Sequence, residues 1–158
     1  MIAADIHIRL ADLSDIPHIQ ALFRDTVLQV NVRDYTDEQV SVWALQAELD
    51  HLWIEKLSET HVLLAILDGR LAGFGTLTID CNIEMLYTAV DAQGRGVATR
   101  LLAELEAEAR RRGYDWLVTD ASLTARRVFE RNGFELVREQ TVELRGAPFT
   151  NYKMMKAL

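Results

Sequence analysis

A strand-like segment that passes through a glycine turn into a helix limits most strongly how this chain can fold. Residues 86–99 read LYTAVDAQGRGVAT. Gly94 and Gly96 permit a tight turn, and apolar residues at helical spacing follow it. The first amides of a helix have no intrahelical partner, and the helix dipole favours an anion beside them. The segment therefore indicates either an anion-binding turn, to which Arg95 can add a charged contact, or a simple strand-to-helix connection.

Two common phosphate-binding motifs do not fit this turn. Neither Gly-Lys-Ser nor Gly-Lys-Thr follows it, which excludes a P-loop. Its Gly-x-Gly-x-Ala spacing, late in a series of strands, is a poor dinucleotide-binding fingerprint. The turn therefore has to be interpreted together with the rest of the sequence.

The surrounding pattern predicts a single α/β domain over residues 1–158, built around one mixed sheet. Neither an internal repeat nor a linker divides the sequence. Short apolar runs between turn residues indicate strands, and apolar residues at helical spacing indicate helices. Strands are expected at 6–10, 61–67, 70–79, 82–88, 116–119, 135–144 and 149–155, and helices at 14–30, 34–57 (one or two), 97–112 and 122–132.

The composition excludes several classes of protein. The 158 residues are 49% hydrophobic and 26% charged, which argues against intrinsic disorder. The net charge of −7 argues against a nucleic-acid partner, because such proteins need a basic surface. Cys81 is the sole cysteine, so a reducing compartment is expected. Residues 1–10 lack the apolar core of a signal peptide, and no stretch reaches the ~18 apolar residues of a membrane span. A cytoplasmic protein without a membrane partner is therefore predicted.

Several motifs together resemble one known family. Residues 93–98, QGRGVA, resemble the Gln/Arg-x-x-Gly-x-Gly/Ala signature of the GNAT N-acetyltransferase superfamily. Residues 86–88 are similar to the strand that precedes this loop in the family, and residues 122–134 are similar to its later Asn-x-x-Ala-x-x-x-Tyr-x-x-x-Gly-Phe helix. The order of elements agrees over essentially the whole chain. Residues 34–39 with Trp43, and the carboxy-terminal tail, look like the YafP-like branch.

The resemblance implies that acetyl-CoA binds between the strand ending at Thr88 and the strand at 116–119. Amides from Gly94 to Thr99 would hold its pyrophosphate, and the pantetheine arm would pair with the backbone at Leu86 and Thr88. A backbone amide near Tyr87 would polarise the thioester carbonyl. The cofactor-binding residues expected from the resemblance are Leu86, Tyr87, Thr88, Gln93, Gly94, Arg95, Gly96, Val97, Ala98, Thr99, Ser122 and Phe129. None of the four histidines has a metal-ligand spacing, so no metal is expected.

The reaction implied is direct attack of a primary amine on the acetyl thioester. A base must take the ammonium proton, and protonation helps the thiolate to leave. Glu84 is the favoured base, with Asp80 and Glu55 as weaker candidates; an ordinary salt-bridged carboxylate is the structural alternative for Glu84. The family's usual acid, a tyrosine, is replaced here by Phe129, so Tyr152, Tyr87 or a water is left for that role.

The acceptor is the least constrained part of this prediction. Tyr35 and Trp43 are candidates for acceptor binding, although Trp43 and Trp53 can equally be core residues. Cys81 can be an acyl-accepting nucleophile or, as is more common, a small core residue. A small-molecule amine is preferred over a protein or peptide acceptor, and either a monomer or a homodimer is expected. A non-catalytic acyl-CoA-binding sensor and transfer of a longer acyl group stay open as alternatives.

Overall fold

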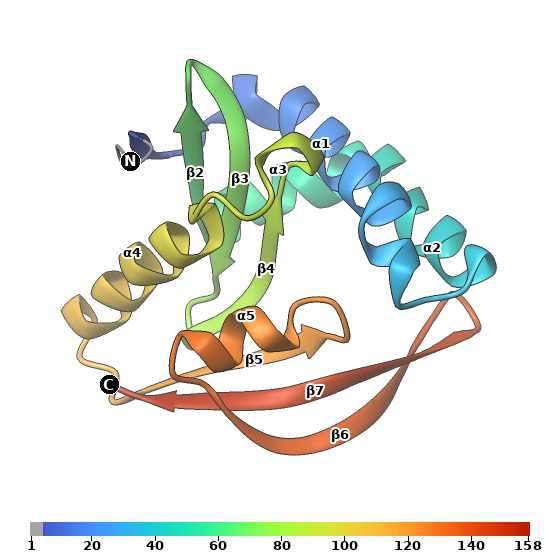
Figure 1. Ribbon diagram of the computed structural model, residues 1–158. Helices are drawn as coiled ribbons and strands as arrows, with labels where there is room; N and C mark the ends of the chain where they lie inside the picture. The colour runs from blue at the N-terminus through green and yellow to red at the C-terminus, as the bar shows by residue number, and fades with distance from the viewer. Residues whose placement is uncertain (1–4) are drawn as a thin grey trace.

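A seven-stranded sheet organises the computed structural model, which describes residues 5–158 (Figure 1). The strands lie in the order β1-β2-β3-β4-β5-β7-β6, and every neighbouring pair is antiparallel except β4 and β5. This arrangement is the mixed α/β sheet that the sequence predicts. The strands are β1 (Ile6–Leu10), β2 (His61–Leu67), β3 (Arg70–Leu77), β4 (Asn82–Thr88), β5 (Trp116–Ser122), β6 (Glu135–Leu144) and β7 (Ala147–Ala157).

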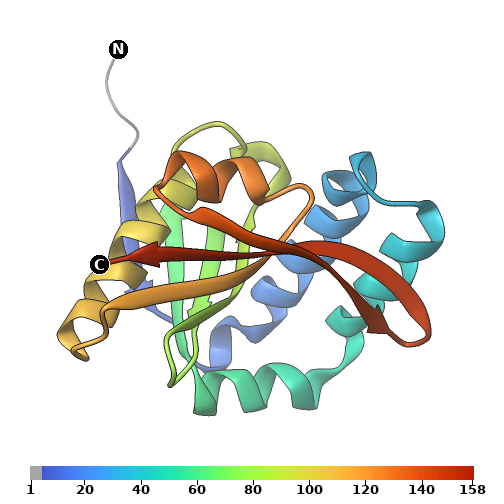
Figure 2. The same ribbon diagram turned by 90° about the horizontal axis from the view of Figure 1, so that it is seen from below.

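Helices cover both faces of strands β2–β4 (Figure 2). One core lies beneath α4 and contains Leu101 and Leu105; the other lies beneath α1–α3 and contains Phe23 and Trp53. Trp53 is 1% exposed, which confirms the core role as the better of its two interpretations. The helices are α1 (Ile16–Gln29), α2 (Asp37–Ala44), α3 (Asp50–Glu59), α4 (Val97–Arg111) and α5 (Arg126–Arg131), with short 3-10 turns η1 (Leu13–Asp15), η2 (Asn31–Arg33), η3 (Leu45–Glu48) and η4 (Val90–Ala92).

Several predicted boundaries were wrong: β5 continues to Ser122 rather than ending at residue 119, and β7 extends beyond 149–155 at both ends. The helix predicted from Ser122 begins only at Arg126, because Ser122 still pairs with Asn151 across β5 and β7. The Ser122 side chain then accepts the N–H of Ala125 at 3.0 Å and forms a turn before α5. The segment 34–57, predicted as one or two helices, contains two, α2 and α3, and the chain leaves helical geometry between them at Leu49, whose ψ is 80°. Strand β3 ends at Leu77 rather than at residue 79.

A close approach at Gly73 fixes the start of α4 against the sheet. A Cβ atom at Gly73 would lie 2.7 Å from Val97 Cγ1 and 2.8 Å from the carbonyl oxygen of Tyr87. Only glycine leaves room for this contact. The amino-terminal end of α4 is therefore held beside the carboxyl end of β4.

The ends of the chain add little to this picture. Residues 1–4, which belong to the predicted domain and to the segment considered as a signal peptide, lie outside the described residues. Within residues 5–158, no helix is long and apolar enough to cross a membrane.

Candidate active site

Strands β4 and β5 part soon after they begin, and this opens one edge of β4 (Figure 1). They pair only at Asn82 with Val118 and at Ile83 with Thr119. The Thr119 hydroxyl fixes the point of separation by donating to the carbonyl oxygen of Ile83 at 2.8 Å. Beyond Ile83, β4 pairs with β3 on one edge, and no strand in residues 5–158 pairs with the other edge.

Backbone groups of alternate residues point to this open edge. The N–H of Met85 donates to Thr76 Oγ1 on β3 at 3.0 Å. Because backbone groups alternate in direction along a strand, those of Leu86 and Thr88 face away from β3. The Thr88 carbonyl oxygen accepts from Thr26 Oγ1 at 3.0 Å and from Gln93 Nε2 at 2.7 Å. The backbone of Leu86 is therefore the freer of the two predicted pairing positions.

The turn before α4 has the conformation that an anion site requires. Gly94 and Gly96 have φ values of 72° and 83°, in the left-handed region that favours glycine. A Cβ at either position would meet no heavy atom within 4 Å, so the turn borders open space. No side chain in the described part of the chain caps α4, and the first backbone bond back to Gly96 comes from Arg100. The amides of residues 97–99 are consequently left for a ligand.

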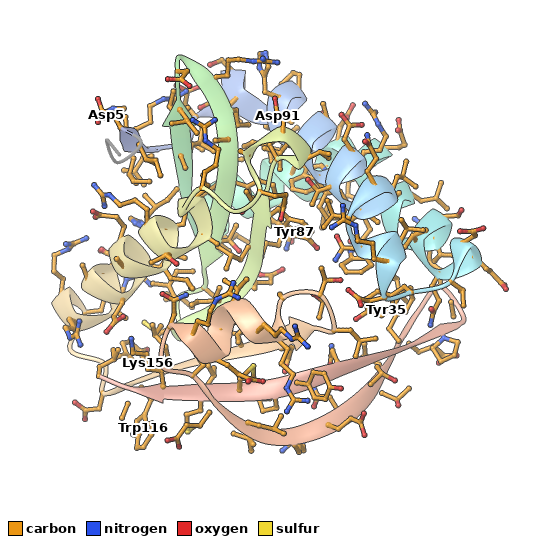
Figure 3. The ribbon with its side chains drawn as sticks, viewed as in Figure 1. Asp5, Tyr35, Tyr87, Asp91, Trp116 and Lys156 are labelled. Carbon is orange, nitrogen blue, oxygen red and sulfur yellow. The ribbon has the colours of Figure 1, made fainter. Side chains whose placement is uncertain are left out.

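The side chains of the turn make different contacts. The Val97 side chain is 1% exposed and belongs to the core, so only its backbone faces the turn. Arg95 lies 3.7 Å from Asp68 on the β2–β3 turn, and both side chains are exposed. Thr99 accepts a bond from Asn132 Nδ2 at 3.3 Å. Gln93 braces the end of β4, as described above. Asp91, on the same connection, is labelled in Figure 3.

A cavity of about 490 Å³ joins the open edge of β4 to a pocket beneath α1–α3. It brings together most of the predicted site residues from β4, the β4–α4 turn, β5, α5 and the amino-terminal helices. Those that line it are Glu84, Leu86, Tyr87, Thr88, Gln93, Ala98, Ser122, Phe129, Tyr35 and Trp43. Those that do not are Gly94, Arg95, Gly96, Val97, Thr99 and Tyr152.

Comparison with known proteins identifies the family of this fold. A model of the acetyltransferase (GNAT) domain matches residues 31–156. The uncharacterized N-acetyltransferase YafP of Escherichia coli K12 is 37% identical over 154 residues, covering 95% of each chain. The chain belongs to the GNAT acetyltransferase family. The predicted family and its YafP-like branch are thereby confirmed.

Solved GNAT structures share the whole architecture. A GCN5-related N-acetyltransferase from Rhodopseudomonas palustris is 32% identical, with a TM-score of 0.96 over 100% of this chain and 99% of that one. PaiA N-acetyltransferase from Thermoplasma acidophilum, solved with coenzyme A, is 18% identical with a TM-score of 0.81, over 98% and 99% of the two chains. The yncA protein of Salmonella typhimurium, solved with its cofactor acetyl-CoA, is 22% identical with a TM-score of 0.66, over 98% and 95% of the two chains. At such identities the last two comparisons concern the fold.

The predicted base of this GNAT domain already holds a cation. Glu84 lies on β4 at the cavity wall, and its carboxylate forms an ion pair with the ammonium of Lys56 on α3. The side chain of Lys56 is 12% exposed and that of Glu84 is 36% exposed. Asp80 and Glu55, the weaker candidates, do not line the cavity. Of the three candidate bases, Glu84 is therefore the one that lines the cavity.

Of the two tyrosines considered as proton donors, one lines the cavity and the other does not. Tyr87 lines the cavity, stacks on Phe74 with ring centroids 5.5 Å apart, and lies beside α1 (Figure 3). Burial raises the pKa of the Tyr87 hydroxyl well above its usual range, so the group keeps its proton. Tyr152 instead lies outside the cavity, with its ring 4.4 Å from the guanidinium carbon of Arg126. Phe129 is 2% exposed and lines the cavity.

Cys81 has the surroundings of a core residue. It is 1% exposed, lies in the turn before β4, and does not line the cavity. Burial raises the pKa of its thiol, which disfavours the nucleophilic thiolate. Across the described residues, no group of three or more His, Cys, Asp or Glu is placed to hold a metal ion.

Tyr35 and Trp43 both line the cavity, but the Tyr35 hydroxyl is occupied by two hydrogen bonds within the fold. It donates to the carbonyl oxygen of Thr150 and accepts from the N–H of Leu123, both at 2.9 Å. Its ring packs edge-on against Trp43, with centroids 5.3 Å apart, at the end of β6 and β7 nearest α2 (Figure 3). Tyr35 thus contributes its ring to the cavity wall rather than a free hydroxyl.

Several polar residues of the cavity were not predicted. Lys56, Asn31 and Thr124 line it from segments that no local pattern connects. Asn151 could have been found, because it shares a face of β7 with buried Phe149 by two-residue alternation. An asparagine two residues after a buried aromatic, on the same strand face, is the signal that was missed.

Proposed function

We propose that the chain transfers the acetyl group of acetyl-CoA to a primary amine of a small molecule. One observation carries this proposal: a single cavity joins the open edge of β4, beside the uncapped start of α4, to the carboxylate of Glu84. Such a cavity can hold donor and acceptor in contact, which direct transfer requires.

The donor side follows from the backbone. The amides of residues 97–99 would bind the pyrophosphate, since charge and dipole both favour an anion at a helix start. The free edge at Leu86 would pair with the pantetheine arm as an added strand. The occurrence of coenzyme A and acetyl-CoA in the PaiA and yncA structures, which share this fold, supports acetyl-CoA as the donor.

The chemical step forms a C–N bond and breaks a C–S bond. The acceptor arrives as an ammonium with a pKa near ~10, so Glu84 has to take its proton before the nitrogen attacks. To do so the carboxylate must exchange Lys56 for the acceptor. The departing thiolate of CoA then takes a proton. Water is favoured for this step, because Tyr152 does not line the cavity and the raised pKa of the Tyr87 hydroxyl disfavours release of its proton.

The size of the cavity supports a small acceptor. About 490 Å³ lies within the range of roughly 300–1,000 Å³ that is common for small-molecule sites. A cytoplasmic location and a monomer or homodimer stay predictions from the sequence, as does the preference for acetyl over longer acyl groups.

The test is turnover, measured as thiol release from acetyl-CoA together with mass spectrometry of the acetylated amine. A Glu84→Gln variant should lose about 100-fold in kcat/KM at pH 7.5, the lower range for loss of a general base. The loss should shrink near pH 10, where the free amine is abundant. Glu55→Gln is the matched control, because this exposed carboxylate lies beside Lys56 in sequence but outside the cavity.

Two results would oppose the proposal. Equal losses in the two glutamine variants would remove Glu84 from the mechanism. Tight binding of acetyl-CoA without turnover on any amine would favour the sensor instead, for which Phe129 in place of tyrosine is the supporting feature. A gain of rate in Phe129→Tyr would instead favour the enzyme over the sensor.

A further inference from the structure

Unpartnered polar atoms gather around the part of the cavity near Tyr35, which we call the acceptor half. Among residues 5–158, four side-chain oxygen atoms are buried and make no hydrogen bond. Three of them belong to residues that line this one cavity: Asn31 Oδ1, Thr124 Oγ1 and Asn151 Oδ1. Asn31 as a whole is 5% exposed. Because buried polar groups in proteins are nearly always hydrogen-bonded, three exceptions around one cavity point to partners that the chain itself does not supply, either water or a polar group of a ligand.

The Tyr35 hydroxyl explains why the three atoms share one place. Asn31 lies four residues before Tyr35, Thr124 directly follows Leu123, and Asn151 directly follows Thr150. Leu123 and Thr150 are the two partners of the Tyr35 hydroxyl, each at 2.9 Å. One buried hydroxyl thus ties together the three segments that present the unpartnered atoms. This is a built arrangement rather than a chance accumulation of polar side chains.

The charges around the cavity select against a carboxylate. Lys56 is the one cationic residue among the described residues that line it, and it is paired with Glu84. Asp120 also lines the cavity and is paired at 3.0 Å with Lys153, which does not line it. Glu143 also lines the cavity and forms no ion pair within residues 5–158. An acceptor with a carboxylate would therefore meet acidic groups and no free cation.

We propose that Asn31, Thr124 and Asn151 form a specificity subsite for an uncharged amide group on the acceptor amine. An asparagine side chain both accepts and donates, so it complements a carboxamide, which also does both. The substrate class is then a primary amine that carries a carboxamide, in preference to the corresponding amino acid or plain alkylamine. This inference rests on the proposed acetyl transfer and names the acceptor for that same site.

The test uses three series of acceptors with matched chain lengths: ω-amino amides, ω-amino carboxylates and n-alkylamines. At the best length, the amide should have a kcat/KM at least about 10-fold above both others. In Asn31→Leu and Asn151→Leu this preference should fall about 10-fold, the size of one lost hydrogen bond (~1.4 kcal/mol). Activity on the alkylamine and binding of acetyl-CoA should change little.

A stability measurement separates this role from a structural one. Replacing an unpartnered buried amide by an apolar side chain of similar size should leave the melting temperature unchanged or raise it. Asn82→Leu is the control, because Asn82 Oδ1 is also unpartnered but lies outside the cavity. This variant should keep the amide preference.

The outcomes are distinguishable. Turnover without any preference for amides would overturn the subsite and leave the acetyltransferase. No turnover on any of the three series, with acetyl-CoA bound, would count against the proposed function itself. Destabilised Asn31→Leu and Asn151→Leu proteins with unchanged acceptor preference would show that the asparagines serve the fold.

Discussion

Removal of the Tyr35 hydroxyl tests how the acceptor half of the cavity is held together. Tyr35→Phe keeps the ring, which packs against Trp43 and Phe149 with centroids 5.3 and 5.7 Å away. It removes the oxygen that bonds to Leu123 N–H and Thr150 C=O. The change therefore isolates two hydrogen bonds at a residue that is 8% exposed.

The expected loss of stability follows from the groups left behind. A buried donor or acceptor without its partner costs about 1–3 kcal/mol, and here water in the cavity can reach one side. We expect a loss of about 2 kcal/mol in the free energy of unfolding. For a protein of this length, that corresponds to a fall of roughly 4–8 °C in melting temperature.

Differential scanning calorimetry measures this loss, with Tyr114→Phe as the matched control. The Tyr114 hydroxyl donates to the carbonyl oxygen of Ile79 at 3.2 Å, but the residue is 39% exposed. The control should lose no more than about 0.5 kcal/mol, as is usual for a surface change. If the two variants melt together, the Tyr35 hydroxyl does not tie these segments and the reasoning fails.

Two further predictions concern the frame around the site. The Arg9 guanidinium, hydrogen-bonded at 2.7 and 2.8 Å, lowers the pKa of Asp15, so this group stabilises the fold above about pH 4 and the contribution is lost as pH falls through the folded-state pKa. Asp15→Asn should cost about 1 kcal/mol at pH 7, because Arg9 is partly exposed, and urea titrations should show the difference vanishing in acid. Gly73→Ala should cost about 1–3 kcal/mol, since its Cβ would meet the backbone oxygen of Tyr87 at 2.8 Å. Thermal melts should show a smaller loss for Gly75→Ala, whose nearest contact is a Leu105 methyl at 3.0 Å; equal losses would contradict this account of the packing.

Local sequence patterns predicted the frame of the molecule well. The turn at Gly94 and Gly96, the strand before it and the helix after it were all predicted from residues 86–99. The start of α2 is equally local, because Thr36 and Gln39 form a capping box with reciprocal bonds of 2.8 and 3.1 Å. These features depend on residues a few positions apart, so one sequence contains the information.

The contacts that shape the acceptor half were out of reach for the opposite reason. Tyr35 bonds to residues 88 and 115 positions away, and Lys56 pairs with Glu84 across 28 positions. Nothing in the local pattern indicates such partners, because they depend on how the sheet brings distant segments together. An acceptor contact at Tyr35 stays a prediction; the structure places its ring at the cavity and its hydroxyl in two hydrogen bonds that the sequence did not indicate.

Calorimetric titration with acetyl-CoA tests the central claim most directly, in wild type, Gly96→Asn and Gly96→Asp. Both substitutions impose the same left-handed strain at φ 83°, and neither Cβ meets an atom within 4 Å. They differ by one negative charge at the start of α4, where the pyrophosphate would lie. Wild type should bind saturably, and Gly96→Asp should bind about 10- to 100-fold more weakly than Gly96→Asn. Equal binding by the two variants, or no binding by folded wild type, would contradict the acetyl-CoA site.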